Sequence, residues 1–178
     1  MKLDKLLVRI VVGFVLVVAL AAFALRSDQV RSTGSIEIAA SPYEVWSNLT
    51  EASKRHLWMQ SVTDAIEVMG AYGTDASSLM LSVSQDGMPA RHIYEDVTLS
   101  LPPLRLDTQI DDPQSILSVA TSYELKERMP GRTTLTVTVD RQLEGWIAPF
   151  FAIVIQQSGD ANVEHNLAHL KRVVEANL

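Results

Sequence analysis

Six short runs of alternating apolar and polar residues, separated by turn-forming residues, fill most of the chain between residues 63 and 139. Such alternation places every second side chain on one face of a β-strand. Turn residues such as Asp86-Gly87, Pro102-Pro103 and Pro130-Gly131 leave links of hairpin length between the runs. Consecutive hairpins indicate an antiparallel meander with one covered face. The apolar faces include Leu79, Leu81, Ile93, Val97, Leu106, Ile110, Val119, Tyr123, Leu125, Leu135, Val137 and Val139.

The segment before this meander predicts one further strand and two short helices. Ile36 and Ile38 alternate with polar neighbours, which indicates a strand over residues 33–39. Ser41-Pro42-Tyr43-Glu44 is typical of a helix start, because the serine can cap, the proline suits the first helical position and the glutamate completes a capping box. Residues 51–59 predict a second short helix that ends near Trp58.

The C-terminal segment predicts a long helix that packs on the sheet. Val163, Leu167, Leu170 and Val174 fall within a sector of about 60° at 100° per residue, which makes one apolar stripe. The apolar residues of 146–155 form a second stripe, offset by roughly a quarter to a third of a turn. Gly159 lies between the stripes, with Ser158 and Asp160 able to cap a restarted helix, so we expect a kink or break there.

Together these elements predict an α+β fold, in which a curved antiparallel sheet of about seven strands surrounds a long C-terminal helix. The length of 178 residues fits one such domain plus an appendage.

The appendage is an apolar run at the N-terminus. Residues 6–25 contain one charge, Arg9, and twenty helical residues span roughly 30 Å, about the thickness of the hydrocarbon core of a bilayer. A cleavable signal peptide is the alternative, because Ala22-Phe23-Ala24 fits a cleavage site, but the run is long for one. We expect an anchor or signal peptide over residues 1–25, a polar tether over 26–32 and a folded domain over 33–178.

The charges around this run predict its orientation. Lys2, Lys5 and Arg9 precede it, so the N-terminus should stay in the cytoplasm. The folded domain is then expected on the other side of an inner or plasma membrane, in the periplasm of a cell that has one.

Charge and composition exclude several classes of function. Without Lys2, Lys5, Arg9 and Asp4, the chain carries 12 basic and 20 acidic residues, a net charge of −8. No Lys/Arg cluster is present, so a nucleic-acid partner is not expected. The absence of cysteine excludes disulfides and thiolate chemistry. No Gly-rich phosphate loop or catalytic triad spacing occurs, so no cofactor is expected.

Several motifs, in the order of the family, resemble the START-like (SRPBCC) superfamily and, within it, the polyketide cyclase/dehydrase-like branch. Residues 38–49 read IAASPYEVWSNL and are similar to the family's entry pattern of a strand followed by S-P-x-x-V-W-x-x-L. The later similar segments are Leu57-Trp58-Met59, residues 65–68 (AIEV), 97–106 (VTLSLPPLRL), 131–136 (GRTTLT) and 170–175 (LKRVVE). The resemblance covers residues 32 to 177 and implies a helix-grip fold.

The resemblance also implies a cavity between the concave face of the sheet and the last helix, suited to an apolar small molecule. An ordinary packed core would use the same aliphatic side chains, and that alternative stays open. The residues expected at a ligand are Trp58, Glu95, Val119, Tyr123, Val137, Phe150, Leu167 and Leu170.

Glu95 is the candidate with the most chemical content. It lies in phase with Ile93 and Val97, so alternation points its carboxylate into the core. A buried carboxylate is costly unless it is paired, and it could act as an acid/base or as an anchor for a polar ligand group. The alternatives are a bulge that turns it outward or an ion pair with an arginine such as Arg91 or Arg105.

The His165/His169 pair and residues 146–155 each have a purely structural explanation beside a functional one. His165 and His169 are spaced for a shared metal, but they lie away from the apolar stripe, so a solvated pair and no metal site is expected. Residues 146–155 are apolar almost all round, which fits an apolar portal, a second membrane contact or a helix start buried under loops.

The leading hypothesis is therefore a membrane-tethered binding module for a hydrophobic small molecule, such as a lipid, a quinone or a polyketide-like compound. The alternative is an enzyme of the cyclase/dehydrase type that acts on an apolar substrate with Glu95 as acid/base. A third possibility is a protein-interaction module whose cavity has lost its ligand. The membrane is a further expected partner, through residues 6–25, and the sequence identifies no protein partner.

Overall fold

The computed structural model describes residues 11, 13–15, 29–84, 90–111, 117–143 and 148–177, without the side chains of Asp111 and residues 148–153. From β1 onward, the element order is strand, three short helical segments, six strands and a long helix. The elements are β1 (Gln29–Ile38), α2 (Pro42–Thr50), the 3₁₀ turn η1 (Ala52–Lys54), α3 (Arg55–Trp58), β2 (Val62–Met69), β3 (Ser78–Val83), β4 (Arg91–Leu101), β5 (Arg105–Asp111), β6 (Leu117–Met129), β7 (Arg132–Leu143) and α4 (Ala148–Ala176).

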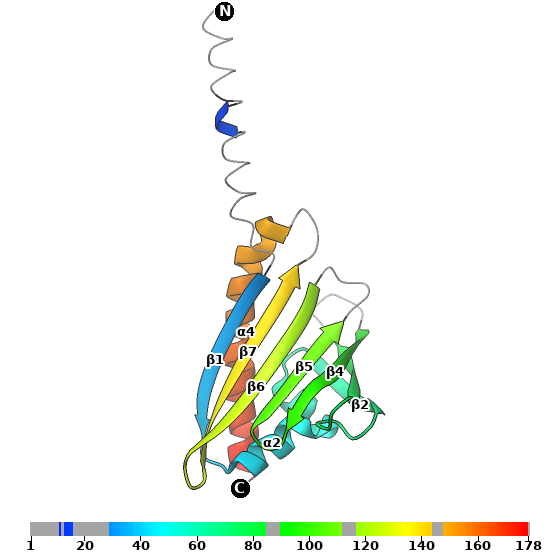
Figure 1. Cartoon of the computed structure of the whole chain (residues 1–178), viewed down its shortest axis with the longest axis vertical. Coiled ribbons are helices and arrows are strands. Elements are labelled where there is room, and N and C mark those ends of the chain that lie inside the picture. The colour runs from blue at the N-terminus through cyan, green and yellow to red at the C-terminus, as the bar shows by residue number, and fades with distance from the viewer. Residues whose placement is uncertain are drawn as a thin grey trace, which may run out of the picture.

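The seven strands form one antiparallel sheet in the order β1-β7-β6-β5-β4-β3-β2. Strands β2 to β7 are the expected meander, and β1 joins at the far edge by pairing with β7. Helix α4 runs along one face of the sheet, behind β1 and β7 in Figure 1, while α2 lies near the C-terminal end of α4. The predicted sheet of seven strands with a C-terminal helix is confirmed.

The entry to the first helix follows its sequence signal. Ser41 caps α2 by accepting a hydrogen bond from the Glu44 amide, and the Glu44 carboxylate accepts one from the Ser41 amide at 2.7 Å. This reciprocal pair satisfies two amides that the first turn of a helix leaves free. The inner side of α2 buries Val45, Trp46 and Leu49, as the spacing predicts.

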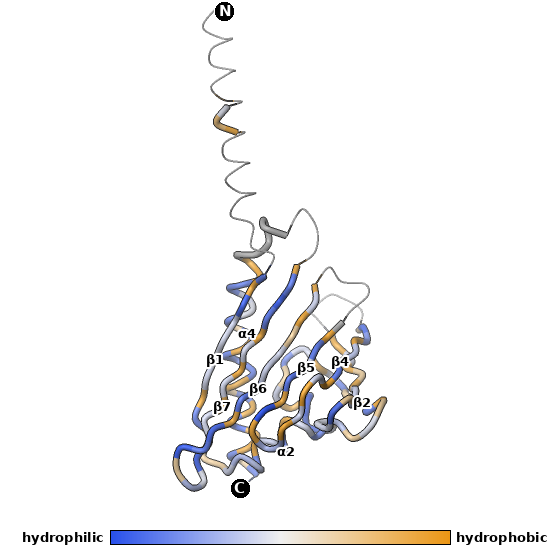
Figure 2. Tube along the Cα trace, in the orientation of Figure 1, coloured by the Kyte–Doolittle hydropathy of each residue, from blue (hydrophilic) through white to orange (hydrophobic). Residues whose placement is uncertain are grey.

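Alternation along the strands separates the core face from the solvent face, as the burial of every second residue along much of β7 shows. Figure 2 shows apolar and polar residues interspersed along the sheet. The α4 stripe of Val163, Leu167, Leu170 and Val174 is buried against this core. The buried strand residues of the same core include Ile38, Leu79, Leu81, Val97, Leu106, Tyr123, Leu125, Leu135, Val137 and Val139.

The first strand begins earlier than the sequence indicates. Residues 29–32, which the composition assigned to the tether, pair with β7 from Gln29 opposite Gln142 onward. Val30 and Ser32 are buried, whereas Arg31 points outward and forms an ion pair with Asp140 at 2.6 Å. The polar composition reflects an edge strand with one solvent-exposed face, so residues 29–32 are part of the sheet.

Helix α4 runs without interruption through Gly159, so the predicted break is wrong. Ser158 and Asp160 do not cap a second helix. The Ser158 hydroxyl donates to the Val154 carbonyl at 2.9 Å, and Gln156 donates to the Asp160 carboxylate. A Cβ at Gly159 would lie 2.6 Å from Arg141 Nη1 and 2.9 Å from Ser32 Oγ. The glycine therefore permits a close approach of α4 to the sheet, rather than a break.

The predictions for residues 6–25 and 146–153 concern segments that lie largely outside the description. Of the N-terminal run, the structure describes residues 11 and 13–15, which are helical. Among the described residues, no helix is both long and apolar enough to cross a membrane. At the other segment, Val154 is exposed and Ile155 packs against Val30 and Leu143.

Gly34 is the point where β1 approaches α4 most tightly. A Cβ there would lie 2.7 Å from Val163 Cγ1 and 2.9 Å from Leu167 Cδ1, both in the packed core. We predict that Gly34→Ala lowers the free energy of unfolding by about 1–3 kcal/mol, because it overpacks this contact. Urea titration followed by tryptophan fluorescence measures the effect.

The matched control is Val163→Ala, alone and combined with Gly34→Ala. The shorter side chain at 163 makes room for the new methyl group, so the double variant should lose less stability than the sum of the single variants. Additive losses would contradict the proposed clash.

Candidate functional site

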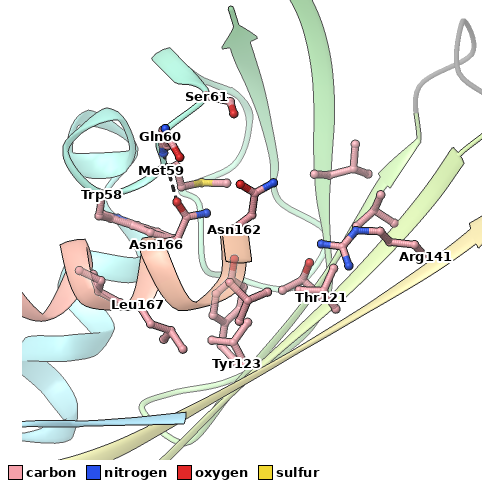
Figure 3. Close-up of a pocket in the computed structure, with 16 residues that line it drawn as sticks. Trp58, Met59, Gln60, Ser61, Thr121, Tyr123, Arg141, Asn162, Asn166 and Leu167 are labelled. Atoms are coloured by element: carbon pink, nitrogen blue, oxygen red, sulfur yellow. Dashed lines mark hydrogen bonds between the residues drawn. The ribbon is translucent and has the colours of Figure 1, made fainter. Parts of the chain in front are cut away.

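A cavity of about 300 Å³ lies between the inner face of the sheet, α4 and the residues that follow α3. Its walls come from segments far apart in the chain, which Figure 3 shows converging on one space. The lining residues are Trp58, Met59, Gln60 and Ser61 after and within α3, Ile110, Val119, Thr121, Tyr123, Val137, Val139 and Arg141 on the sheet, and Asn162, Val163, Asn166, Leu167 and Leu170 on α4.

Six of the eight residues predicted at a ligand line this cavity together. They are Trp58, Val119, Tyr123, Val137, Leu167 and Leu170. The side chain of Phe150 lies outside the description. Glu95 is buried, but it is not part of the cavity wall.

One end of the cavity is apolar and aromatic. Tyr123 on β6 lies opposite Val137 on β7, and Leu167 and Leu170 cover them from α4. The Trp58 and Tyr123 rings meet edge to face, with centroids 6.5 Å apart and planes at 88°. The Trp58 indole donates to the Asn48 carbonyl at 3.2 Å, which fixes the ring and leaves its faces for packing.

Polar side chains that were not predicted from the sequence line the rest of the wall. They are Gln60, Ser61, Thr121, Arg141, Asn162 and Asn166. Asn166 accepts a hydrogen bond from the Gln60 amide at 3.2 Å and so ties α4 to the segment after α3 (Figure 3). Asn162 and Asn166 stand four residues apart beside the apolar stripe of α4, so one helix turn presents both to the cavity. The spacing of these two asparagines beside the apolar stripe was the sequence signal that could have identified them as cavity residues.

Glu95 lies in the core, as its phase predicts, but its partner is Arg55 of α3 rather than Arg91 or Arg105. Both side chains are almost fully buried, with relative residue exposures of 1% for Glu95 and 0% for Arg55. Arg55 Nη2 donates to Glu95 Oε2 and also to the Tyr72 hydroxyl at 2.8 Å. Arg105 instead pairs with Asp107 at 2.9 Å on β5. Forty positions separate Arg55 from Glu95, so no local pattern connects them.

The surroundings of Arg55 keep it charged. The guanidinium carbon lies 5.0 Å from the Trp58 ring centroid and 5.1 Å from that of Tyr72, so aromatic faces flank the cation. Burial acts to lower the pKa of Arg55, but the Glu95 carboxylate and the neighbouring tyrosines outweigh it and raise that pKa. Burial raises the pKa of both Tyr72 and Tyr123, so these phenols remain neutral hydrogen-bond donors at physiological pH.

The histidine pair behaves as a surface feature. The His165 and His169 rings stack 4.2 Å apart on the exposed side of α4. Burial lowers the pKa of His169, with smaller effects from Arg172 and His165. Within the described part of the chain, no group of three or more His, Cys, Asp or Glu residues is placed to hold a metal ion.

Solved structures with the same fold come from proteins of low sequence identity. A START superfamily protein from Mycobacterium smegmatis is 16% identical, with a TM-score of 0.70 over 83% of this chain and 99% of the other. The ZhuI aromatase/cyclase of a Streptomyces species is 14% identical, with a TM-score of 0.68 over 83% of this chain and 94% of the other. A norcoclaurine synthase variant from Thalictrum is 10% identical, with a TM-score of 0.62 over 84% and 96%.

These likenesses establish the fold, since their identities are too low to transfer an activity. No curated protein sequence matches the chain significantly. The family model described as polyketide cyclase/dehydrase and lipid transport matches residues 29–175, which begins where β1 begins. This protein therefore belongs to the polyketide cyclase/dehydrase and lipid transport family, and it has the fold of the START superfamily protein described above.

Proposed function

We propose that this protein is a membrane-tethered module that binds a hydrophobic small molecule, such as a lipid, a quinone or a polyketide-like compound, between the sheet and α4. The observation that carries the proposal is the cavity itself. A volume of about 300 Å³ stays open beside a continuous cluster of buried hydrophobic residues. Ligand sites occupy about 300–1,000 Å³, so one small molecule fits. The description of the family includes lipid transport, which agrees with an apolar ligand.

The tether supports the same function by location. Residues 6–25 are apolar except for Arg9, and the described part of this run exposes Val11, Phe14 and Val15 on a helix. An exposed apolar helix is favourable in lipid and unfavourable in water. Residue 29 begins the sheet directly after this run, so the domain would stay close to the bilayer, where apolar compounds concentrate.

An enzyme that uses Glu95 as acid/base fits the contacts less well. The carboxylate is held by Arg55, is almost fully buried and does not line the cavity. A general acid or base must reach its substrate directly or through one water molecule. Glu95 instead joins α3 to β4 and thereby holds Trp58 at the cavity wall.

Binding can be tested with the neutral fluorophore N-phenylnaphthylamine and the full chain in phosphatidylcholine nanodiscs, with empty nanodiscs as background. The probe should bind the wild type and quench tryptophan emission. Thr121→Phe places a ring in the cavity from a half-buried position, so it should abolish binding with little loss of stability.

The matched control is Ala120→Phe, the neighbouring residue on the outer face of β6, which should leave binding unchanged. Binding that survives Thr121→Phe, or no binding to the wild type, would remove the support for a ligand in this cavity.

The role of Glu95 as the buried ion-pair partner of Arg55 gives a second prediction. Glu95→Gln leaves the buried Arg55 without its counter-charge and should lower the free energy of unfolding by about 3–5 kcal/mol. Replacing both residues, as Arg55→Met with Glu95→Leu, should recover most of that loss, because an apolar pair leaves no buried charge. An acid/base without a structural role would show the opposite pattern: Glu95→Gln would unfold normally and lose only turnover. Urea titrations of the three variants distinguish the two roles.

The proposed orientation is tested by a reporter enzyme, active only in the cytoplasm, fused after Leu178. We expect it to be silent, because Lys2, Lys5 and Arg9 keep the N-terminus in the cytoplasm. The same reporter fused before Met1 is the control and should be active. Activity of the C-terminal fusion would reverse the proposed topology.

A further inference from the structure

Arg141 is the one charged side chain among the described residues that line the cavity. It comes from β7 and extends towards Thr121 and Asn162, on the side of the cavity away from Trp58 and Leu167 (Figure 3). A half-buried cation in a cavity wall carries a desolvation penalty, which a bound anion would offset.

The protein only partly supplies that anion. Arg141 is half-buried, and burial lowers the pKa of Arg141, with a smaller opposing effect from Asp160. Its guanidinium donates to Ser32 Oγ at 2.9 Å, and no carboxylate in the described residues forms an ion pair with it. The Asp160 carboxylate is exposed and accepts from Gln156 at 2.9 and 3.0 Å. It also interacts with Ser32, so this hydroxyl links it to Arg141 without a direct ion pair. The remaining guanidinium donors are available to a ligand.

The cavity is therefore polarised along its length. Strand pairing places Tyr123 opposite Val137, then Thr121 opposite Val139, then Val119 opposite Arg141. Along α4 the same direction runs from Leu170 through Leu167 to Asn162. A ligand that satisfies both ends has an apolar body among Tyr123, Leu167 and Leu170, and an anionic group at Arg141.

Resting on the binding function proposed above, we propose that the ligand is a small single-chain amphiphile with an anionic head group, a carboxylate or a phosphate, and that Arg141 selects it. The planar guanidinium suits either group, since it can form two parallel hydrogen bonds to carboxylate or phosphate oxygens. The volume of about 300 Å³ is at the lower end for ligand sites and favours one chain over two.

The position of Arg141 also fits a ligand that enters from lipid. Arg141 pairs with Val30, the second residue of β1, which follows the apolar run of residues 6–25. In the tethered arrangement, the charged end of the cavity is the end nearest the bilayer. An amphiphile would enter with its chain first and keep its head group at Arg141.

The test compares three probes with the same ten-carbon chain: decanoate, decyl phosphate and the neutral decanol. Each displaces N-phenylnaphthylamine from the full chain in phosphatidylcholine nanodiscs, for the wild type, Arg141→Gln and Arg141→Lys. The partition of each probe into empty nanodiscs is measured first, and displacement is compared at equal free concentrations of the probes, so that partition into the bilayer does not affect the comparison. For the wild type, at least one anionic probe should displace roughly tenfold better than decanol, as hydrogen bonds to a charged group allow.

Arg141→Gln should lose this preference and bind decanol within about twofold of the wild type, whereas Arg141→Lys should retain part of it. The stronger of decanoate and decyl phosphate identifies the head group. Equal displacement by all three probes, or a preference that survives Arg141→Gln, would overturn the role of Arg141 and leave the binding function standing. Failure of the fluorophore to bind the wild type at all would instead reject the binding function.

Discussion

The contact between β1 and α4 determines how wide the domain is and where its cavity lies. β1 pairs with β7 and lies against the last helix, so two segments more than 120 residues apart meet at Gly34 and Val163. A side chain at Gly34 would hold α4 away from this edge of the sheet, and glycine at 159 permits a second close approach beside Arg141. With the helix fixed close to β1, the curved sheet leaves its open space further along, under β5, β6 and β7.

The second wall of that space depends on a buried ion pair. Arg55 is on a helix of only four residues, which has little stability of its own. Its bond to Glu95 on β4 and its contacts with Trp58 and Tyr72 join this short helix to the sheet. Trp58 then packs on Tyr123, and the segment Met59 to Ser61 closes the cavity. A charge pair in the core contributes little net stability, but removing one partner is costly, which makes it an effective constraint on the position of α3.

The cavity lies between these elements, and the polarity of its lining differs from one part to another. Its aromatic end is built from core residues, and the rest of its lining carries amides, two hydroxyls and one guanidinium. Apolar area provides affinity for a ligand, while a few placed polar groups provide orientation and selectivity. A START superfamily protein, an aromatase/cyclase and a norcoclaurine synthase share this fold, so the fold alone does not determine what such a cavity binds.

The sequence by itself determined the elements, because strand alternation, the Ser41–Glu44 capping box and the α4 stripe are local patterns. It also placed Glu95 in the core by phase, and six cavity residues by phase and family resemblance.

Only the tertiary structure decided the rest. Arg55 and Glu95 are forty positions apart, and nothing in either neighbourhood identifies the other. Gly159 reads locally as a helix breaker, but the close approach of Arg141 and Ser32 explains it. Arg141 itself looks like an ordinary strand residue until β1 and α4 enclose it, since burial and unpaired charge are properties of the assembled fold.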